Sequence, residues 1–226
     1  MRLTAHLCGA YCTQLLAGDF SFVRELHQQH GFARVQVNAT AANGIDVGSL
    51  GARQCVEGLR AAMGALPGVE FILQHNEETR ALWEGLLLRG SGSGGGGGNG
   101  GSAAPTAAPR NLSLLFDESK GLGTLAASWP GAAEAAGVPF GYAGGLGPDN
   151  VAEQLGRMAG PAAGLPVWID MESSLRTMRP RGDDGHDHGG GAQEDTFDVG
   201  KALRCLEAAV ELGLARSAPV EASGGR

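Results

Sequence analysis

Features that identify several large classes of protein are missing from this 226-residue sequence. It has no run of about eighteen apolar residues, so we predict no membrane span. Its formal charge is −7 and it has no basic patch, which excludes a nucleic-acid-binding surface. The four cysteines are scattered without a C-x-x-C pair, which favours reduced thiols over a disulfide framework. We therefore expect an intracellular protein of the cytoplasm, or of a plastid if a transit segment has been lost.

Aromatic residues are also scarce, at 5%, whereas glycine occurs 39 times and is concentrated in two segments. Residues 90–110 are rich in Gly and Ser and then in Ala and Pro, and residues 181–195 form an acidic, Gly-rich stretch. Neither segment has enough apolar surface to offset its chain entropy. We interpret the first as a flexible insertion and the second as a disordered loop, both within one domain over residues 1–226.

Strand-like and helix-like segments alternate along the rest of the chain. The expected strands are 3–8, 33–38, 69–75, 112–117, 138–143 and 166–171, and the expected helices are 21–30, 50–66, 77–88, 125–136, 150–159 and 199–212. In the last helix, four apolar residues share one face: Val199, Leu203, Leu206 and Val210. This alternation predicts an α/β fold with a parallel sheet, either a barrel or an open doubly wound sheet.

Polar residues or glycine follow each expected strand, namely Cys8, Asn38, His75, Asp117, Gly144, and Asp170 with Glu172. In a parallel β/α structure these ends lie on one face, which is where such folds place their chemistry. The positions therefore predict a polar pocket. The alternative is that strand ends meet solvent and tolerate polarity for that reason alone.

Two of these strand ends have features of a phosphate site. Gly144 and Gly145 have no Cβ, so their backbone N–H groups can approach a bulky anion. Pro148 and Asp149 follow them, as expected at the start of a helix. After the next strand, the segment 170–174 adds two carboxylates and two serines.

These motifs resemble those of the phosphoribosylanthranilate isomerase family. The segment 144–151, Gly-Gly-Leu-Gly-Pro-Asp-Asn-Val, is similar to that family's Gly-Gly-Leu-x-Pro-x-Asn-Val. The segment 170–174, Asp-Met-Glu-Ser-Ser, is similar to the family's Asp-Val-Ser-Ser-Gly. The segment 114–117, Leu-Leu-Phe-Asp, is similar to its Leu-Leu-Asp, and the segment 121–124, Gly-Leu-Gly-Thr, is similar to its Gly-Gly-Thr-Gly. The resemblance covers roughly residues 3–212 and is clearest from 112 to 176.

The resemblance implies a (β/α)₈ TIM barrel that performs an Amadori-type isomerisation in tryptophan biosynthesis, with no metal or cofactor. Asp117 matches the general acid, and the phosphate of the substrate would be held by Gly144, Gly145, Ser173 and Ser174. The other expected substrate-binding residues are Asn38, His75, Asp170 and Glu172. The implied partner is thus a phosphorylated small molecule.

The sequence departs from the family pattern near its start. Six β/α units are recognisable, and the better alignment makes residues 3–8 the third strand, so the first two strands are absent together with the family's catalytic cysteine. Cys8 is a candidate replacement base, with His6 on the same strand face, or else an inert thiol. A partial barrel exposes two sheet edges, which predicts self-association or a partner that fills the gap.

Three other readings remain open. A non-catalytic relative would need only the anion site. A metal-dependent epimerase would need His75, Asp117 and Asp170 to converge, and an aldolase would need a lysine such as Lys120. The triplet 186–188, His-Asp-His, is either a metal site or a solvated part of the acidic loop.

Overall fold

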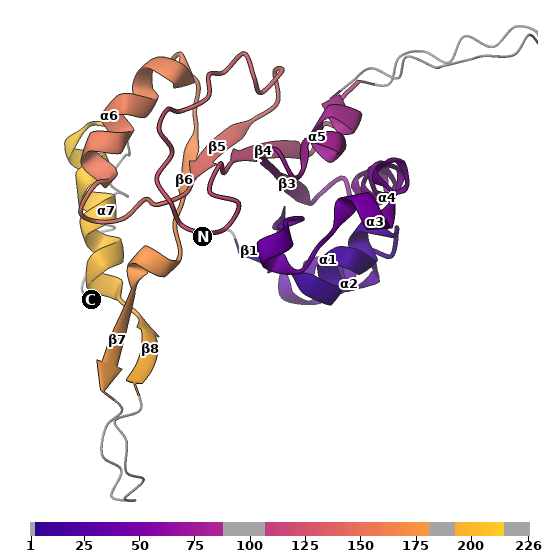
Figure 1. Ribbon diagram of the computed structural model, residues 1–226, viewed down its shortest axis with the longest axis horizontal. Coiled ribbons are helices and arrows are strands. Elements are labelled where there is room, and N and C mark those ends of the chain that lie inside the picture. The colour runs from indigo at the N-terminus through magenta and orange to yellow at the C-terminus, as the bar shows by residue number, and fades with distance from the viewer. Residues whose placement is uncertain (1–2, 88–106, 181–192, 215–226) are drawn as a thin grey trace, which may run out of the picture.

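The computed structural model describes residues 3–87, 107–180 and 193–214 of the chain. Its centre is a six-stranded, all-parallel sheet whose strands lie in the order of the sequence (Figure 1). The strands are β1 (Thr4–Leu7), β2 (Arg34–Val37), β3 (Glu70–His75), β4 (Leu112–Phe116), β5 (Phe140–Ala143) and β6 (Trp168–Asp170). Each lies within one of the six expected segments, so the α/β class and the parallel sheet are confirmed.

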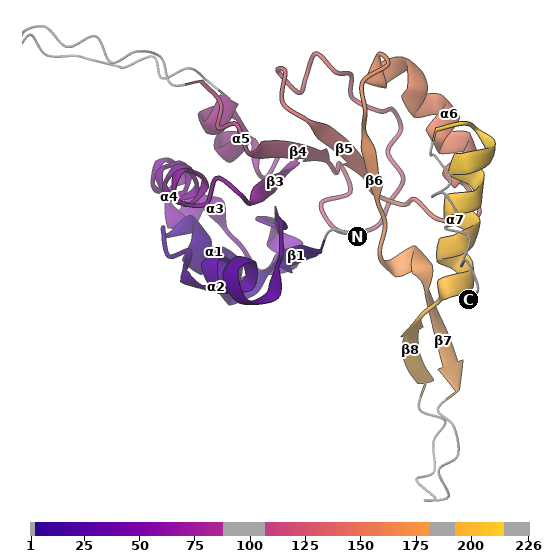
Figure 2. The same cartoon turned by 180° about the vertical axis from the view of Figure 1, so that it is seen from behind.

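Helices cover the outer face of this sheet in two groups. The first group lies beside β1 to β4 and consists of α1 (Gly9–Leu16), α2 (Ser21–His30), α3 (Val47–Leu50), α4 (Ala52–Ala65) and α5 (Arg80–Leu87). The second group consists of α6 (Val151–Ala162) and α7 (Val199–Glu211) beside β5 and β6, as the reverse view in Figure 2 also shows. The expected long helix 50–66 is divided into α3 and α4 by Gly51, which adopts a φ of +84°.

The sheet is curled into a half-barrel, with its two ends close enough for side chains to meet across the interior. Gln36 Nε2 on β2 donates to Asp170 Oδ2 on β6 at 3.3 Å. Near the other end of the strands, the Arg34 guanidinium lies 4.9 Å from the centre of the Trp168 ring. The curvature is therefore that of a closing barrel rather than of an open twisted sheet.

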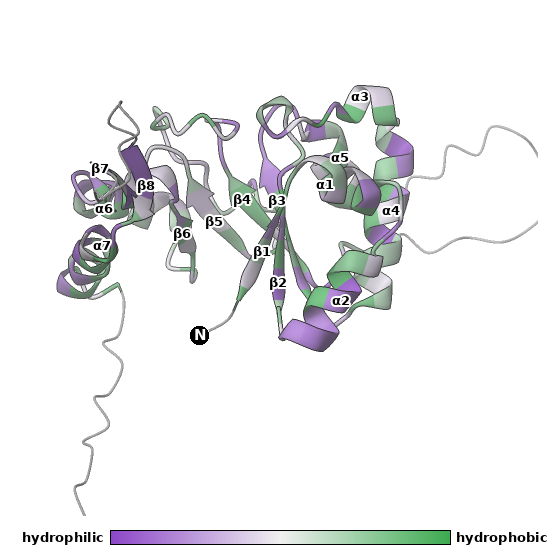
Figure 3. Cartoon of the chain, turned by 90° about the horizontal axis from the view of Figure 1, so that it is seen from below, coloured by the Kyte–Doolittle hydropathy of each residue, from purple (hydrophilic) through white to green (hydrophobic). Residues whose placement is uncertain are grey.

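Alternation along the strands separates two apolar regions. The outward-facing residues join the helices in the main core, which includes Val35, Phe71, Leu73, Leu114 and Phe140. The inward-facing residues form a small separate cluster of Ile72, Leu115, Ala143 and Trp168. In Figure 3, coloured by hydropathy, the helices carry both green and purple segments, as expected of elements with one buried side and one exposed side. Because side chains with a period of two fill both faces, the inner strands β2 to β5 are largely buried on both sides, whereas β1 and β6 at the edges are partly exposed.

One expected helix is absent, and two elements of the structure were not expected. Residues 125–136 form turns instead of a helix, because Pro130 interrupts the segment and Trp129 Nε1 is held by Gln154 Oε1 at 3.1 Å. Helix α1 was not expected. After β6 the chain forms an unexpected antiparallel hairpin of β7 (Arg176–Pro180) and β8 (Gln193–Phe197), so residues 193–195 of the expected disordered loop are a strand.

Other expectations fall wholly or partly outside the described residues. The insertion at 90–110 is described only from residue 107, and the His186–His188 triplet is not described. All four cysteines are free thiols. No helix within the described ranges is long and apolar enough to cross a membrane.

Candidate functional site

A cavity of about 510 Å³ opens at the carboxyl ends of the strands, inside the curl of the half-barrel. All six strands of the sheet contribute to it, each through the last residues of the strand or the first of the loop that follows. Its lining includes Asn38, Gln74, Asp117, Gly144, Gly145, Asp170, Glu172, Ser173 and Ser174. The structure thus brings together all the sequence-predicted site residues except Cys8 and His75.

Asp117 is the most enclosed carboxylate of this cavity, with 4% of its surface exposed. Its Oδ1 accepts a 2.5 Å hydrogen bond from Ser119 Oγ. Its Oδ2 accepts from Gln74 Nε2 at 3.0 Å and from the Gly121 N–H at 3.1 Å. The two nitrogen groups can only donate, whereas the serine hydroxyl can donate or accept. A proton carried by Asp117 therefore belongs on Oδ1, where Ser119 can turn to accept it.

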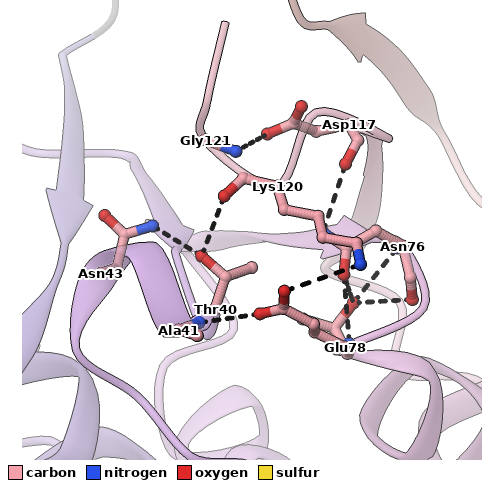
Figure 4. Close-up of polar contacts among 9 residues, drawn as sticks. Thr40, Ala41, Asn43, Asn76, Glu78, Asp117, Lys120 and Gly121 are labelled. Atoms are coloured by element: carbon pink, nitrogen blue, oxygen red, sulfur yellow. Dashed lines mark hydrogen bonds and ion pairs between the residues drawn. The ribbon is translucent and has the colours of Figure 1, made fainter. Parts of the chain in front are cut away.

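The loop after Asp117 is fixed by contacts with the loops of two neighbouring strands (Figure 4). Asn76 Nδ2 donates to the Asp117 carbonyl at 3.2 Å, and Thr40 Oγ1 donates to the Lys120 carbonyl at 3.4 Å. Glu78 accepts from the Ala41 N–H at 2.7 Å and lies 3.7 Å from the Lys120 ammonium. Because three loops share these bonds, the position of the Asp117 carboxylate is determined by more than its own strand.

Gln74 supplies an unusual group to the same region. It is 3% exposed, and within the described residues its Oε1 is buried without a hydrogen-bond partner. A buried polar atom without a partner costs about 1–3 kcal/mol. If the Gln74 amide nitrogen moved away from Asp117, the carboxylate would lose a hydrogen-bond donor. The free-energy cost of the unpartnered Oε1 therefore accompanies the hydrogen bond that holds Asp117 in position.

Cys8 lies outside the lining of the cavity but is linked to it by a chain of amide groups. Asn38 Nδ2 donates to the Cys8 sulfur at 3.3 Å, and Asn38 Oδ1 accepts from Gln36 Nε2 at 3.1 Å. The same Gln36 nitrogen reaches Asp170 across the interior. Cys8 is also the N-cap residue of α1 and is exposed.

The other three thiols are buried and differ from Cys8 in their chemistry. Burial raises the pKa of Cys12 to about 12 and also raises the pKa values of Cys55 and Cys205. These three thiols therefore stay protonated near neutral pH. Cys8 is the cysteine that solvent and a ligand can reach.

The two glycines after β5 are required by a close approach between loops. Gly145 has a φ of +64°, and a Cβ there would lie 2.4 Å from the Leu125 nitrogen. Asn150 fixes this loop, since its Oδ1 accepts from the Gly147 N–H at 2.9 Å and its Nδ2 donates to the Gly145 carbonyl at 2.8 Å. The glycine pair therefore has a packing reason independent of any ligand.

Unused backbone donors surround this part of the cavity. Within the described residues, no hydrogen bond is made by the backbone N–H groups of Gly144, Gly145, Ser173 and Ser174. Ser174 Oγ donates to the Leu146 carbonyl at 2.5 Å, which joins the loop after β6 to the loop after β5. Among the described residues, no lysine or arginine lines the cavity. An anion bound here would be held by amide N–H groups instead of by cationic side chains.

His75 does not belong to this cavity. Its ring faces the helices, where it stacks on Trp83 at 4.0 Å and lies edge-on to Phe116 at 4.7 Å. Burial lowers the pKa of His75, so the ring is neutral at pH 7. Because neighbouring side chains of a strand point to opposite faces, the last position of β3 faces away from the cavity while Gln74 faces into it.

The position of His75 also contradicts the metal-dependent reading, which required His75, Asp117 and Asp170 to converge. No cluster of three metal-ligating side chains occurs in the ranges that the structure describes. Lys120, the aldolase candidate, pairs with Glu78 and lines a second pocket near His75 instead of the cavity at the strand ends.

Four polar side chains of the cavity were missed by sequence reasoning: Gln36, Asn43, Gln74 and Ser119. Gln36 and Gln74 are amides that each follow an apolar residue near the carboxyl end of a strand, and that signal was present in the sequence. Ser119 carried no comparable signal, since it is one of several polar residues in a loop. Comparisons of the chain with protein-family models, curated proteins and solved structures found no match.

Proposed function

We propose that the cavity binds a phosphorylated sugar derivative and catalyses its isomerisation in the manner of phosphoribosylanthranilate isomerase, on a partial TIM barrel. One observation carries this proposal: four residues whose backbone N–H groups have no partner among the described residues line the same cavity as a buried, fixed carboxylate. The donors suit a phosphate, and the carboxylate suits proton transfer at the sugar. The donors and the carboxylate come from the same segments of the chain that carry the family motifs.

An Amadori-type isomerisation needs proton transfers and no net oxidation. A general acid protonates the ring oxygen as the bond from that oxygen to C1 breaks, which leaves a protonated imine. A general base then removes the proton at C2, and the resulting enaminol becomes the ketone as C1 gains a proton and the C2 hydroxyl loses one. Asp117 is the proposed acid, with Ser119 and Gln74 as positioning residues. Cys8 is the proposed base, because Asn38 directs a donor at its sulfur.

A second candidate function is binding without catalysis. It is favoured by the place of Cys8, which lies outside the lining of the cavity although Asn38 is part of it. The described lining of the cavity also offers no lysine or arginine for a substrate carboxylate. A protein of this kind would use the four amide donors to hold the phosphate of a metabolite and would leave the sugar unchanged.

Binding and turnover of phosphoribosyl anthranilate separate these functions. Calorimetric titration with a non-reactive analogue measures binding, and product formation measures turnover. We expect micromolar binding, which Ser173→Asp weakens at least about tenfold because it places a carboxylate beside the amide donors. Ser173→Asn is the matched control, of similar size and uncharged, and it should bind within about threefold of the wild type.

Asp117→Asn then tests the chemistry. Retained binding with turnover reduced at least about a hundredfold supports the isomerase. Binding without turnover in the wild type overturns the isomerase and leaves the binding function. If the folded chain binds neither the analogue nor ribose 5-phosphate, both functions are wrong.

A further inference from the structure

Several side-chain oxygens of the cavity are hydrogen-bond acceptors that lack a donor. Gln74 lines the cavity, is 3% exposed, and has no partner for its Oε1 within the described residues. Asp170 is half-buried and accepts one hydrogen bond, at Oδ2 from Gln36 Nε2 at 3.3 Å, so its Oδ1 is free to accept another. A ligand that satisfies these atoms must donate hydrogen bonds to them.

The charge of the lining supports the same conclusion. Asp117, Asp170 and Glu172 are carboxylates of the lining, and no lysine or arginine accompanies them within the described ranges. His6 is the remaining titratable side chain there. A carboxylate on the ligand would therefore meet like charges in an enclosed site, where their repulsion is poorly screened.

The hydrogen bond from Gln36 indicates which part of a ligand Asp170 would meet. It crosses the interior from β2 to β6, so the Asp170 carboxylate faces the space between these strands. The unused backbone donors lie instead on the loops that follow β5 and β6. A phosphoribosylated amine carries its phosphate and its amine at opposite ends of the ribose. With the phosphate on the backbone donors, the amine part extends into the rest of the cavity, which Asp170 and Gln74 line.

We propose that the substrate of this cavity is a phosphoribosylated amine whose amine part carries N–H donors, as a carboxamide does, and no carboxylate. This inference rests on the proposed function and narrows its substrate class. Asp170 is the specificity-determining residue, because its carboxylate accepts a charge-assisted hydrogen bond from an amide and repels a carboxylate in the same place. Phosphoribosyl anthranilate has a carboxylate on its ring, so it binds less tightly than its carboxamide counterpart.

Two ligands that differ in one group test the proposal. The first is a non-reactive analogue of phosphoribosyl anthranilate, and the second is the same analogue with its carboxylate replaced by a carboxamide of nearly equal size. Calorimetric titration of the full chain at pH 8, where histidines carry little positive charge, measures both affinities. We expect the carboxamide to bind at least about tenfold more tightly than the carboxylate.

Asp170→Asn removes the charge that produces this preference. The asparagine Oδ1 can still accept from Gln36, so the contact across the interior is kept. The two affinities should then agree within about threefold, because the neutral amide no longer repels the carboxylate. Asp149→Asn is the matched control: Asp149 is exposed and lies outside the cavity lining, so the same loss of charge should leave the affinity ratio unchanged.

The outcomes separate this inference from the proposed function. If both analogues bind equally, or the carboxylate binds more tightly, the inference is wrong and the proposed function stands. A preference for the carboxamide that persists in Asp170→Asn overturns the role of Asp170. Binding of ribose 5-phosphate but of neither analogue also overturns the inference, since the phosphate site then exists without room for an amine part. If none of the three ligands binds, the proposed function and the inference are both wrong.

Discussion

The hydrogen bonds around Asp117 lead to a quantitative expectation for two variants that both remove its charge. In Asp117→Asn, the amide oxygen can accept from Gln74 and from the Gly121 N–H, and the new NH₂ group can donate to the Ser119 hydroxyl, which turns to accept. All three contacts survive as neutral hydrogen bonds. In Asp117→Ala none survives, and the Gln74 carboxamide, whose Oε1 already has no partner, loses its remaining one.

The difference between the two variants does not include the desolvation of the carboxylate, because neither variant carries it. Three neutral hydrogen bonds contribute about 0.5–1.5 kcal/mol each, and part of this is regained at Gly121, which is exposed to water. We therefore expect Asp117→Asn to be about 2–4 kcal/mol more stable to unfolding than Asp117→Ala.

Urea denaturation followed by circular dichroism measures this difference directly. The matched control is the pair Asp149→Asn and Asp149→Ala, because Asp149 is exposed and its side chain makes no hydrogen bond to the described residues. That pair should differ by less than about 0.5 kcal/mol. If the Asp117 pair also differs by less than about 1 kcal/mol, the network that fixes the carboxylate is not formed in solution, and the acid role loses its structural basis.

Two further changes test other parts of the structure. Gly145→Ala should lower the free energy of unfolding by about 2–4 kcal/mol in urea denaturation, because a Cβ would lie 2.4 Å from Leu125 N at a φ of +64°. Gly156→Ala, in the exposed part of α6 with nothing within 4 Å, should instead stabilise by about 0.5–1 kcal/mol, and equal effects would contradict the close approach. Burial lowers the pKa of His75 below 6.5, so the unfolded chain takes up a proton first and stability falls as the pH drops from 6.5 toward the folded-state pKa. His75→Phe keeps an aromatic ring on Trp83 and should remove this part of the pH dependence. The measurement is the difference between the free energies of unfolding at pH 7 and pH 5, and a difference equal to that of the wild type would refute the assignment.

The parallel sheet was predictable because strand-like and helix-like segments alternate along the chain, and the residue pattern of each strand is a local feature of the sequence. The segment 125–136 shows where this reasoning stops. Its alanines favour a helix, but Pro130 interrupts the segment and Trp129 is anchored on α6 through Gln154. Such a contact joins residues far apart in the sequence, so no local pattern reveals it. The β7–β8 hairpin was missed for a similar reason, since it follows a short strand and its sequence was read as part of an acidic loop.

The cavity was predictable to the extent that parallel strands end on one face. His75 shows the limit of that argument. The rule predicts the end of the sheet at which the polar residues lie, but not the face of the sheet to which each side chain points. A shift of one residue along β3 decides that Gln74 enters the cavity and His75 stacks on Trp83. Likewise the link from Cys8 through Asn38 and Gln36 crosses the barrel to Asp170, and it depends on a curvature that the sequence does not express.

The two ends of the half-barrel interior differ in how completely their polar groups are satisfied. At the amino ends of the strands, Arg34 pairs with Glu70 at 2.9 Å, Ser113 donates to the same carboxylate at 2.6 Å, and Trp168 covers the guanidinium. At the carboxyl ends, the Asp117 carboxylate has no cationic partner in the described ranges, Gln74 Oε1 has no donor, and the amides around Gly145 and Ser173 have no acceptor.

A chain that satisfies its interior charges at one end and leaves donors and acceptors unmatched at the other gives up stability at the second end. Burial on the helix side does not account for this, since β2 to β5 contribute outward-facing residues to the main core at both ends. A ligand would account for it, because an anion with hydroxyl groups supplies acceptors for the free amides and a proton acceptor for Asp117. This contrast within one sheet is what supports a phosphorylated sugar as the partner of the carboxyl end, and it is the reason to test binding before turnover.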